Sequence, residues 1–227
     1  MANGETRARH IYIIGAQCTG KTTLVNALEA ELASLTDAQK RRLISRPTFI
    51  REVARTVLKE KQFRREDITT SPARALQLQQ HILDAQLSAE QAIPTHTDPS
   101  AWYICDRSGL DPIVYARVFV GEDAAERMLA TEAWKELEGR MKEGIVFLCE
   151  AGSSWLVDDG IRLMPTGLEE WMYVDMAFRE LLAVRQIGYM IIPKDLASLA
   201  ERVRVVREQI ILRENESQMD ATDALTR

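Results

Sequence analysis

The sequence of 227 residues contains little cysteine and no long apolar segment. Its three cysteines, Cys18, Cys105 and Cys149, are odd in number and lack the spacing of zinc ligands, so they predict reduced thiols in an intracellular, cytoplasmic protein. No apolar run approaches the roughly 20 residues that a membrane-spanning helix requires. Residues 1–10 are short and polar, unlike a secretory signal. Neither a membrane nor a structural zinc ion is therefore an expected partner.

An excess of positive charge is also missing. The chain has 29 lysines and arginines against 34 aspartates and glutamates, a net charge of −5, so nucleic acid is not an expected partner. There is no internal repeat, low-complexity tract or linker between domains. The 46% of hydrophobic residues suffices for one sizeable core. We therefore expect a single domain over residues 1–213, followed by a flexible polar tail at 214–227.

Short apolar runs alternate with longer amphipathic segments, which is typical of an α/β fold with a parallel sheet. Several runs are apolar throughout, as strands covered on both faces are. The predicted strands are residues 11–14, 48–50, 102–105, 145–149 and 189–192. Helices are predicted directly after the glycine-rich loop, over about 73–93, over 122–142, and along an apolar stripe from Leu196 to Ile210 with Asp195 as its N-cap.

The glycine-rich loop carries the most specific motif of the chain. The segment GAQCTGKT, from Gly15 to Thr22, fits the phosphate-loop pattern G-x-x-x-x-G-K-S/T, and it lies between a predicted strand and a predicted helix, as this motif requires. Glycines allow the backbone to wrap closely around phosphate, and successive N–H groups bind the anion. A chance match to the pattern alone occurs in on the order of one chain in a hundred. The predicted strand before the motif and the predicted helix after it make a chance match rarer.

The motif predicts a site for ATP or GTP with Mg²⁺. Lys21 is expected to contact the β- and γ-phosphates, the Thr22 hydroxyl to bind magnesium, and Thr23 to lie near the α-phosphate. The predicted nucleotide-binding residues are Gly15, Ala16, Gln17, Cys18, Thr19, Gly20, Lys21, Thr22 and Thr23.

Charged residues directly follow the third predicted strand. Ligands of open parallel sheets lie at the carboxyl ends of the strands, so Asp106 is a candidate for a magnesium-bound water or a catalytic role. The alternative is a helix cap, because a helix is predicted near Ser108. Arg107 is a candidate for clamping a phosphate or a substrate anion, with an ordinary surface salt bridge as its alternative.

A second charged group, Arg51-Glu52-Val-Ala-Arg55, follows the second predicted strand. Glu52 is placed to act as a general base on a hydroxyl acceptor, and Arg51 and Arg55 to flank an anion. The alternative is a solvated first turn of a helix, where arginine and glutamate are common.

Two further groups are candidates for substrate contact. Gln79 and Gln86 lie seven residues apart on one stripe of the predicted helix, where a buried amide needs either a substrate or a structural partner. Residues 151–168 are a candidate lid that carries Arg162 for the transferring phosphoryl group and Asp158 and Asp159 for substrate or magnesium. The alternative for this segment is a charged surface turn.

Taken together, GAQCTGKTTLVNAL, FIREVAR, QLQQHILDAQ, YICDRS and DDGIR occur in a recognisable order. Over about residues 11–206 the chain resembles the small P-loop family, with an AAA-type domain, that is typified by the ribosylnicotinamide kinase domain of NadR proteins. The resemblance implies a P-loop NTPase three-layer α/β sandwich, similar to nucleoside and nucleotide kinases, with a five-stranded parallel sheet of order 2-3-1-4-5. It also implies ATP-dependent phosphotransfer to a small molecule that carries a hydroxyl group.

By the same resemblance, Lys21 and Thr22 serve the nucleotide and magnesium, Asp106 is the metal-side carboxylate, Glu52 lies nearest the acceptor and Arg162 is the lid arginine. The chain departs from the family where it reads Asp106-Arg-Ser in place of paired aspartates, which leaves the acceptor open.

Three functions compete at this point. The first is a small-molecule kinase with a nucleoside-like acceptor. The second is a nucleotide-dependent switch or binding protein, since residues 106–109 fit D-x-x-G, although the chain has no N-K-x-D motif for guanine. The third is an oligomeric AAA+ motor, which the lack of a separate C-terminal helical domain disfavours.

Overall fold

The computed structural model describes residues 10–35, 45–95, 97–98, 100–153 and 167–210, and a parallel five-stranded sheet forms its centre. The strands are β1 (Ile11–Ile14), β2 (Thr48–Ile50), β3 (Tyr103–Asp106), β4 (Ile145–Cys149) and β5 (Met190–Ile192). Their order is β2-β3-β1-β4-β5, and all neighbouring strands are parallel. The predicted fold class and sheet order are confirmed.

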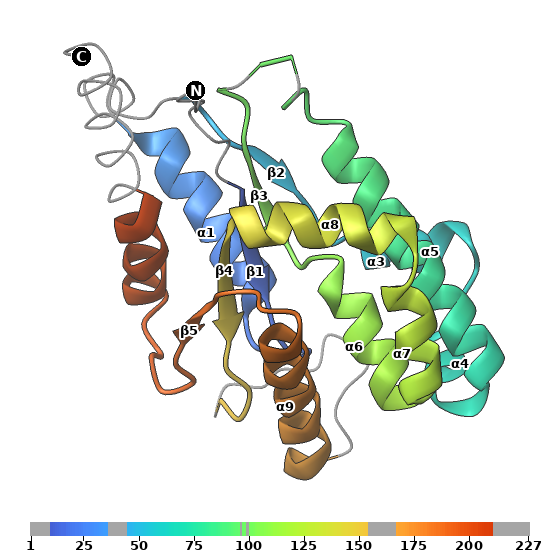
Figure 1. Ribbon diagram of the computed structural model, residues 1–227. Coiled ribbons are helices and arrows are strands. Elements are labelled where there is room, and N and C mark those ends of the chain that lie inside the picture. The colour runs from blue at the N-terminus through green and yellow to red at the C-terminus, as the bar shows by residue number, and fades with distance from the viewer. Residues whose placement is uncertain (1–9, 36–44, 96, 99, 154–166, 211–227) are drawn as a thin grey trace.

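Helices cover both faces of the sheet and give three layers (Figure 1). One face carries α1 (Lys21–Ser34) and the helix over residues 199–210, the terminal helix of the described chain. The other carries α5 (Pro72–Gln91), α6 (Leu110–Phe119), α8 (Glu132–Glu143) and α9 (Leu168–Val184). The shorter helices α3 (Val53–Glu60) and α4 (Arg65–Thr70) pack on α5, and α7 (Glu122–Leu129) packs on α6.

Side chains of the central strand alternate between two apolar cores. Tyr12 and Ile14 face the layer of α5, α6, α8 and α9, while Ile11 and Ile13 face α1 and the terminal helix. All four are buried, which explains why the strand reads as a continuous apolar run. Ile13 pairs with Asp106 of β3, so the loop after β1 lies beside the carboxyl end of β3.

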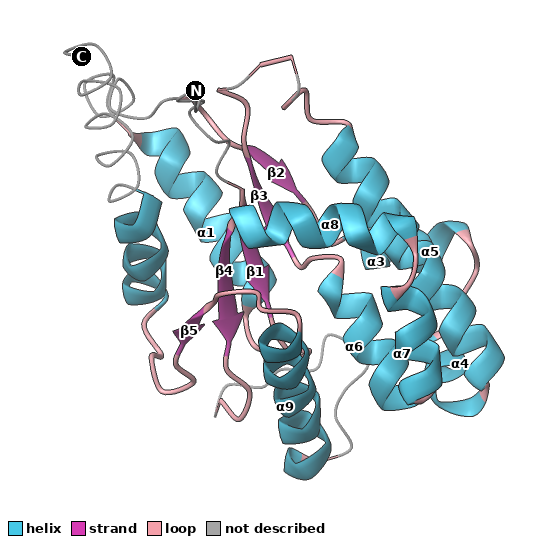
Figure 2. Cartoon of the chain, viewed as in Figure 1, coloured by secondary structure: helices cyan, strands magenta, loops and turns pink. Residues whose placement is uncertain are grey.

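Two predicted helices differ from the structure (Figure 2). The helix predicted over 122–142 is two helices, α7 and α8, because the Thr131 hydroxyl accepts a hydrogen bond from the Trp134 N–H at 3.2 Å and starts α8 there. The prediction of Asp195 as an N-cap is wrong. The terminal helix begins at Leu199, and the Ser198 hydroxyl accepts from the Glu201 N–H at 3.3 Å.

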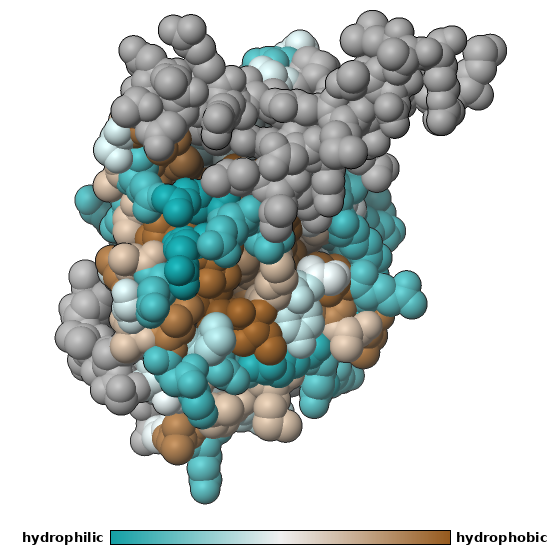
Figure 3. Space-filling view, turned by 90° about the vertical axis from the view of Figure 1, so that its left-hand side faces the viewer, coloured by the Kyte–Doolittle hydropathy of each residue, from teal (hydrophilic) through white to brown (hydrophobic). Residues whose placement is uncertain are grey.

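The sheet ends at β5, an edge strand on which Ile191 is 41% exposed. Figure 3 shows the molecule from this side, where apolar residues lie among polar ones. Within the described ranges, no helix combines the length and the hydropathy that crossing a bilayer requires. Most of the predicted lid at 151–168, and the whole tail at 214–227, lie outside the described residues.

Candidate active site

The loop between β1 and α1 has the backbone of a phosphate cradle. Gly15 and Gly20 have φ values of 133° and 76°, in the region that favours glycine. A Cβ on Gly15 would lie 2.5 Å from the Cys149 carbonyl oxygen, and one on Gly20 would lie 2.7 Å from Arg202 Nη1. Conformation therefore favours glycine at both positions that the motif fixes, and at Gly15 the backbone of Cys149 leaves no space for a side chain.

Lys21 lies folded into this loop. Its ammonium group donates to the carbonyl oxygens of Gly15 at 2.8 Å and Ala16 at 2.5 Å, and to Thr19 Oγ1 at 3.3 Å. Burial, and then the nearby positive charge of Arg107, lower the Lys21 pKa to about 8. Phosphate oxygens can replace the loop carbonyls as acceptors and would stabilise the charged form of the lysine.

Asp106 ends β3 beside the phosphate loop, and its carboxylate is buried at 1% exposure. Neither carboxylate oxygen has a hydrogen-bond partner among the described residues. A buried, unpaired carboxylate is costly without a ligand. Its negative charge acts on the pKa of Lys21, which places the two groups close together. Thr22, in the first turn of α1, is half-buried. These oxygens fit Mg²⁺, which usually takes one or two protein ligands and completes its shell with water and phosphate.

A cleft with an empty volume of about 690 Å³, including its part open to solvent, adjoins the loop. Helices α3 to α6 and the phosphate loop enclose it. One wall is apolar and consists of Ala54, Leu58, Ile68, Leu78, Ile82 and Pro112. The polar residues of the lining are Gln17, Glu52, Arg55, Gln79, Arg107, Asp111 and Tyr115. This mixed lining of apolar and polar side chains suits a small organic molecule.

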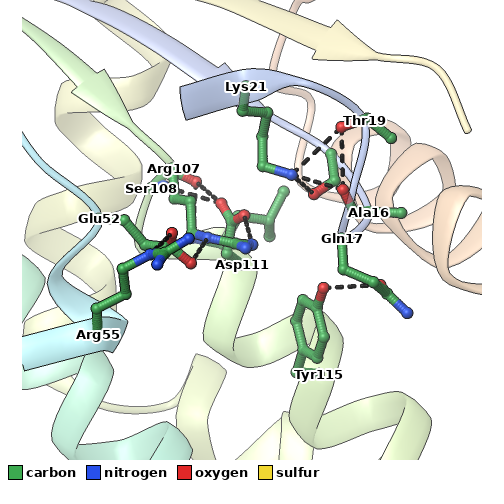
Figure 4. Close-up of polar contacts among 12 residues, drawn as sticks. Ala16, Gln17, Thr19, Lys21, Glu52, Arg55, Arg107, Ser108, Asp111 and Tyr115 are labelled. Atoms are coloured by element: carbon green, nitrogen blue, oxygen red, sulfur yellow. Dashed lines mark hydrogen bonds and ion pairs between the residues drawn. The ribbon is translucent and has the colours of Figure 1, made fainter. Parts of the chain in front are cut away.

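Glu52 lies between two arginines at the polar end of this cleft (Figure 4). Its carboxylate accepts from Arg107 Nε and from Arg55 Nε, each at 2.8 Å, and its side chain is 8% exposed. Arg107 also contacts Asp111 Oδ1 at 3.3 Å and has a φ of 85°, which is strained for a residue with a Cβ. The network therefore holds two carboxylates around one buried guanidinium group.

A hydrogen bond from α6 reaches the phosphate loop beside this network. The Tyr115 hydroxyl, which lines the cleft together with Arg107, donates to Gln17 Oε1 at 2.8 Å. Burial raises the Tyr115 pKa to about 12, which keeps the hydroxyl protonated. This direction fixes the Gln17 amide, whose Nε2 is buried and has no partner among the described residues. Gln17 Nε2 is therefore a hydrogen-bond donor at the boundary between the phosphate loop and the cleft.

The sequence profile of a family described as AAA domain matches residues 10–202. The chain belongs to this AAA domain family. None of the curated proteins matches it in sequence.

Solved structures are similar to this AAA domain in fold. The deoxyadenosine kinase of M. mycoides with dATP bound has a TM-score of 0.58 at 13% identity, over 89% of this chain and 98% of that chain. The same enzyme with dCMP and dCDP gives a TM-score of 0.57 at 13% identity, over 88% and 98%. NadR in complex with NR gives 0.58 at 16% identity, over 88% of this chain and 51% of NadR. The chain thus spans about half of NadR, and the predicted likeness to NadR is confirmed at the level of the fold.

Several predicted site residues come together in the AAA domain, and others do not. Glu52, Arg55, Gln79 and Arg107 line the cleft. Arg51 does not line the cleft: it donates to Asn26 Oδ1 at 2.5 Å and pairs with Glu29, both on α1. Asp158, Asp159 and Arg162 lie outside the described residues.

Gln86 is also absent from the cleft. Its amide Nε2 donates to Glu90 Oε1 at 2.8 Å inside the core, which is a structural partner of the kind that a buried amide needs. Asp111 lines the cleft and was missed. It accepts from the Ser108 N–H at 2.8 Å and the Ser108 hydroxyl at 3.0 Å, ahead of α6. The pattern Ser-x-x-Asp before an apolar run is the signal that predicts such a capping pair.

Proposed function

We propose that this AAA domain is a Mg²⁺-dependent kinase that transfers the γ-phosphoryl group of ATP, or of GTP, to a hydroxyl group of a small, nucleoside-like molecule. The observation that carries the proposal is the shared boundary between the phosphate loop and a cleft that holds Glu52. A protein that only binds or hydrolyses a nucleotide needs no such second pocket. The fold of deoxyadenosine kinase supports a nucleoside-like acceptor.

The residues of the loop fit a nucleoside triphosphate. Its phosphates would accept hydrogen bonds from the backbone N–H groups between Gly15 and Thr22. They would also replace the loop carbonyls as acceptors for the ammonium group of Lys21. Thr22 and Asp106 would hold magnesium, directly or through water, and the bound ion supplies charge neutralisation of the phosphates. Positioning and electrostatic stabilisation then lower the barrier, with little covalent work for the protein.

On the acceptor side, Glu52 would take the proton of the attacking hydroxyl group. The hydroxyl oxygen forms a bond to the γ-phosphorus, the bond from the γ-phosphorus to the β,γ-bridging oxygen breaks, and the nucleoside diphosphate leaves. Arg55 and Arg107 stabilise the negative charge of Glu52 before the transfer. Gln79 and the apolar wall leave room for a flat ring that has few polar atoms.

The test is nucleotide consumption by the pure protein with Mg·ATP and Mg·GTP, alone and with pooled nucleosides and small hydroxyl metabolites, beside Lys21→Ala. Consumption that an acceptor stimulates, and that Lys21→Ala abolishes, is the expected result. Tight nucleotide binding with slow hydrolysis and no acceptor would refute the kinase and favour a nucleotide-dependent switch. In that case the search would turn to protein partners that distinguish the two nucleotide states.

A further inference from the structure

Two carbonyl groups of the phosphate loop, those of Gln17 and Thr19, are held by side chains from outside the loop. A phosphate loop binds its ligand through backbone N–H groups. In a planar trans peptide unit the N–H and the C=O point in opposite directions, so each N–H faces the ligand only while its carbonyl faces away. Whatever fixes those carbonyls therefore fixes the ligand-binding donors. In this chain two side chains from distant helices do so.

The first is Arg202 in the terminal helix. Its Nη2 donates to the Thr19 carbonyl oxygen at 2.9 Å, across 183 residues of sequence, and its Nη1 lies against Gly20. Arg202 is only 4% exposed and also hydrogen-bonds the Cys149 thiol at the end of β4. An arginine is rarely buried so completely, because desolvating its charge is costly. The peptide that it orients is the one whose N–H belongs to Gly20.

The second is Trp171 in α9. Its indole Nε1 donates to the Gln17 carbonyl oxygen at 2.8 Å, across 154 residues, and the side chain is 3% exposed. The peptide that it orients is the one whose N–H belongs to Cys18. The two contacts reach the loop from opposite faces of the sheet, since α9 and the terminal helix pack in different cores.

We propose that Trp171 and Arg202 are positioning residues that together brace the phosphate loop, so that its N–H groups face the triphosphate before nucleotide arrives. A pre-oriented loop does not have to be ordered on binding, and its affinity for phosphate is correspondingly higher. The brace also joins both helical layers to the nucleotide, so nucleotide binding stabilises α9 and the terminal helix. The inference rests on the nucleotide-binding part of the proposed function and not on the acceptor.

The test compares Trp171→Phe, Arg202→Met and Arg202→Lys with Trp134→Phe. Trp134 is a suitable control because its side chain is fully buried in α8 and its indole N–H has no partner among the described residues. The readouts are the Kd of fluorescent Mg·mant-ATP, its displacement by inorganic triphosphate, and the Tm of each ligand-free variant. Titrations are performed well below the lowest Tm.

Trp171→Phe and Arg202→Met are expected to weaken the binding of inorganic triphosphate roughly tenfold, since each removes the side-chain donor that holds a loop carbonyl. Arg202→Lys keeps one donor and should recover much of that loss. Trp134→Phe should lower the Tm without changing either affinity. Wild-type affinity in both Trp171→Phe and Arg202→Met, or an equal loss in Trp134→Phe, would overturn the brace. If the wild type itself bound no nucleotide, the proposed function would fail first and the brace with it.

Discussion

Two buried polar clusters of this domain are built alike and yet differ in use. The cleft cluster consists of Gln17, Glu52, Arg107, Asp111 and Tyr115. The tyrosine cluster consists of Tyr12, Gln86, Glu90 and Tyr103. Each surrounds a glutamate that accepts several hydrogen bonds. Glu52 accepts from two guanidinium groups, whereas Glu90 accepts from Tyr12 at 3.0 Å, Tyr103 at 2.6 Å and Gln86 at 2.8 Å.

The difference lies in the charge of the partners and in access. Arginines favour an ionised carboxylate, and Glu52 faces a cleft at the carboxyl end of the sheet. Hydroxyl and amide groups carry no charge, and burial raises the pKa of Glu90, which is completely enclosed. Burial and hydrogen bonds are therefore shared by Glu90 and by Glu52, the proposed proton acceptor. Charge compensation and an open path for a ligand distinguish them.

The largest expected effect is a loss of kcat when Glu52 of the cleft cluster is substituted. Glu52→Gln removes the proposed proton acceptor and should lower kcat by about 10²- to 10⁴-fold, with nucleotide affinity nearly unchanged. The measurement is steady-state kinetics with a saturating acceptor. The matched control is Glu29→Gln, which loses an ion pair with Arg51 on the surface of α1 and should turn over like the wild type. A near-normal kcat for Glu52→Gln would show that Glu52, like Glu90, does not take part in the transfer.

The tyrosine cluster should respond in stability and not in catalysis. Glu90→Ala leaves the hydroxyls of Tyr12 and Tyr103 and the amide of Gln86 without their acceptor. We expect a loss of about 4 kcal/mol in the free energy of unfolding, because buried unsatisfied donors are costly. Urea denaturation measures it, and Glu90→Gln should restore part of it. A large change in kcat/KM for folded Glu90→Ala would show that the enclosed cluster also serves the site.

The pH dependence of stability tests the enclosure of the tyrosine cluster through His10, which lies at its edge. His10 stacks on Tyr103 at 3.7 Å between ring centroids, and burial, followed by the positive charge of Arg140, lowers its pKa from 6.5 to about 4. The unfolded chain binds a proton below pH 6.5 while the folded chain does not. The stabilisation is therefore complete above pH 6.5 and is lost as the pH falls toward 4, by about 3 kcal/mol.

The variant that isolates this effect is His10→Phe, which keeps an aromatic ring beside Tyr103. The difference in unfolding free energy between the wild type and His10→Phe should change by that amount between pH 7 and pH 4. Denaturation at several pH values gives the measurement, and the opposing titration of Glu90 cancels in the difference. A constant difference over this range would contradict the neutral, buried state of His10.

The smallest effects are expected from substituting the two glutamines of α5, Gln79 and Gln86. Gln79→Leu should raise the KM of the acceptor by about tenfold and leave stability almost unchanged, because Gln79 lines the cleft. Gln86→Leu should lower the unfolding free energy by about 1 kcal/mol and leave KM unchanged, since it loses the bonds to Glu90 and Cys105. Kinetics and urea denaturation of both variants provide the comparison. If Gln86→Leu raised KM and Gln79→Leu lowered only stability, Gln86 and not Gln79 would belong to the acceptor site.

Prediction from sequence succeeded where the physics is local. The phosphate loop is eight contiguous residues; both of its glycines are favoured by their own φ angles, and Gly15 also by close contact with the Cys149 backbone. The strands were placed to within one residue, and β1 and β4 are apolar throughout because they are buried on both faces. The break between α7 and α8 was missed, because the amphipathic pattern continues through Thr131 and only its hydroxyl cap marks a new helix.

The site beyond the loop depended on packing. Gln79 and Gln86 lie on one stripe, but about 10 Å of helix separates them, so one reaches the cleft and the other the core. No local pattern indicates that Tyr115 contacts the phosphate loop across 98 residues, or Trp171 and Arg202 across more.

The sequence by itself therefore determined an α/β domain with a phosphate loop, because local backbone geometry and continuous burial are written into neighbouring residues. Only the tertiary structure decided which charged groups share the cleft and which side chains orient the loop. Those choices follow from how the helices lie on the sheet, and a hydrogen bond between distant residues exists only once that packing has brought its two atoms within reach.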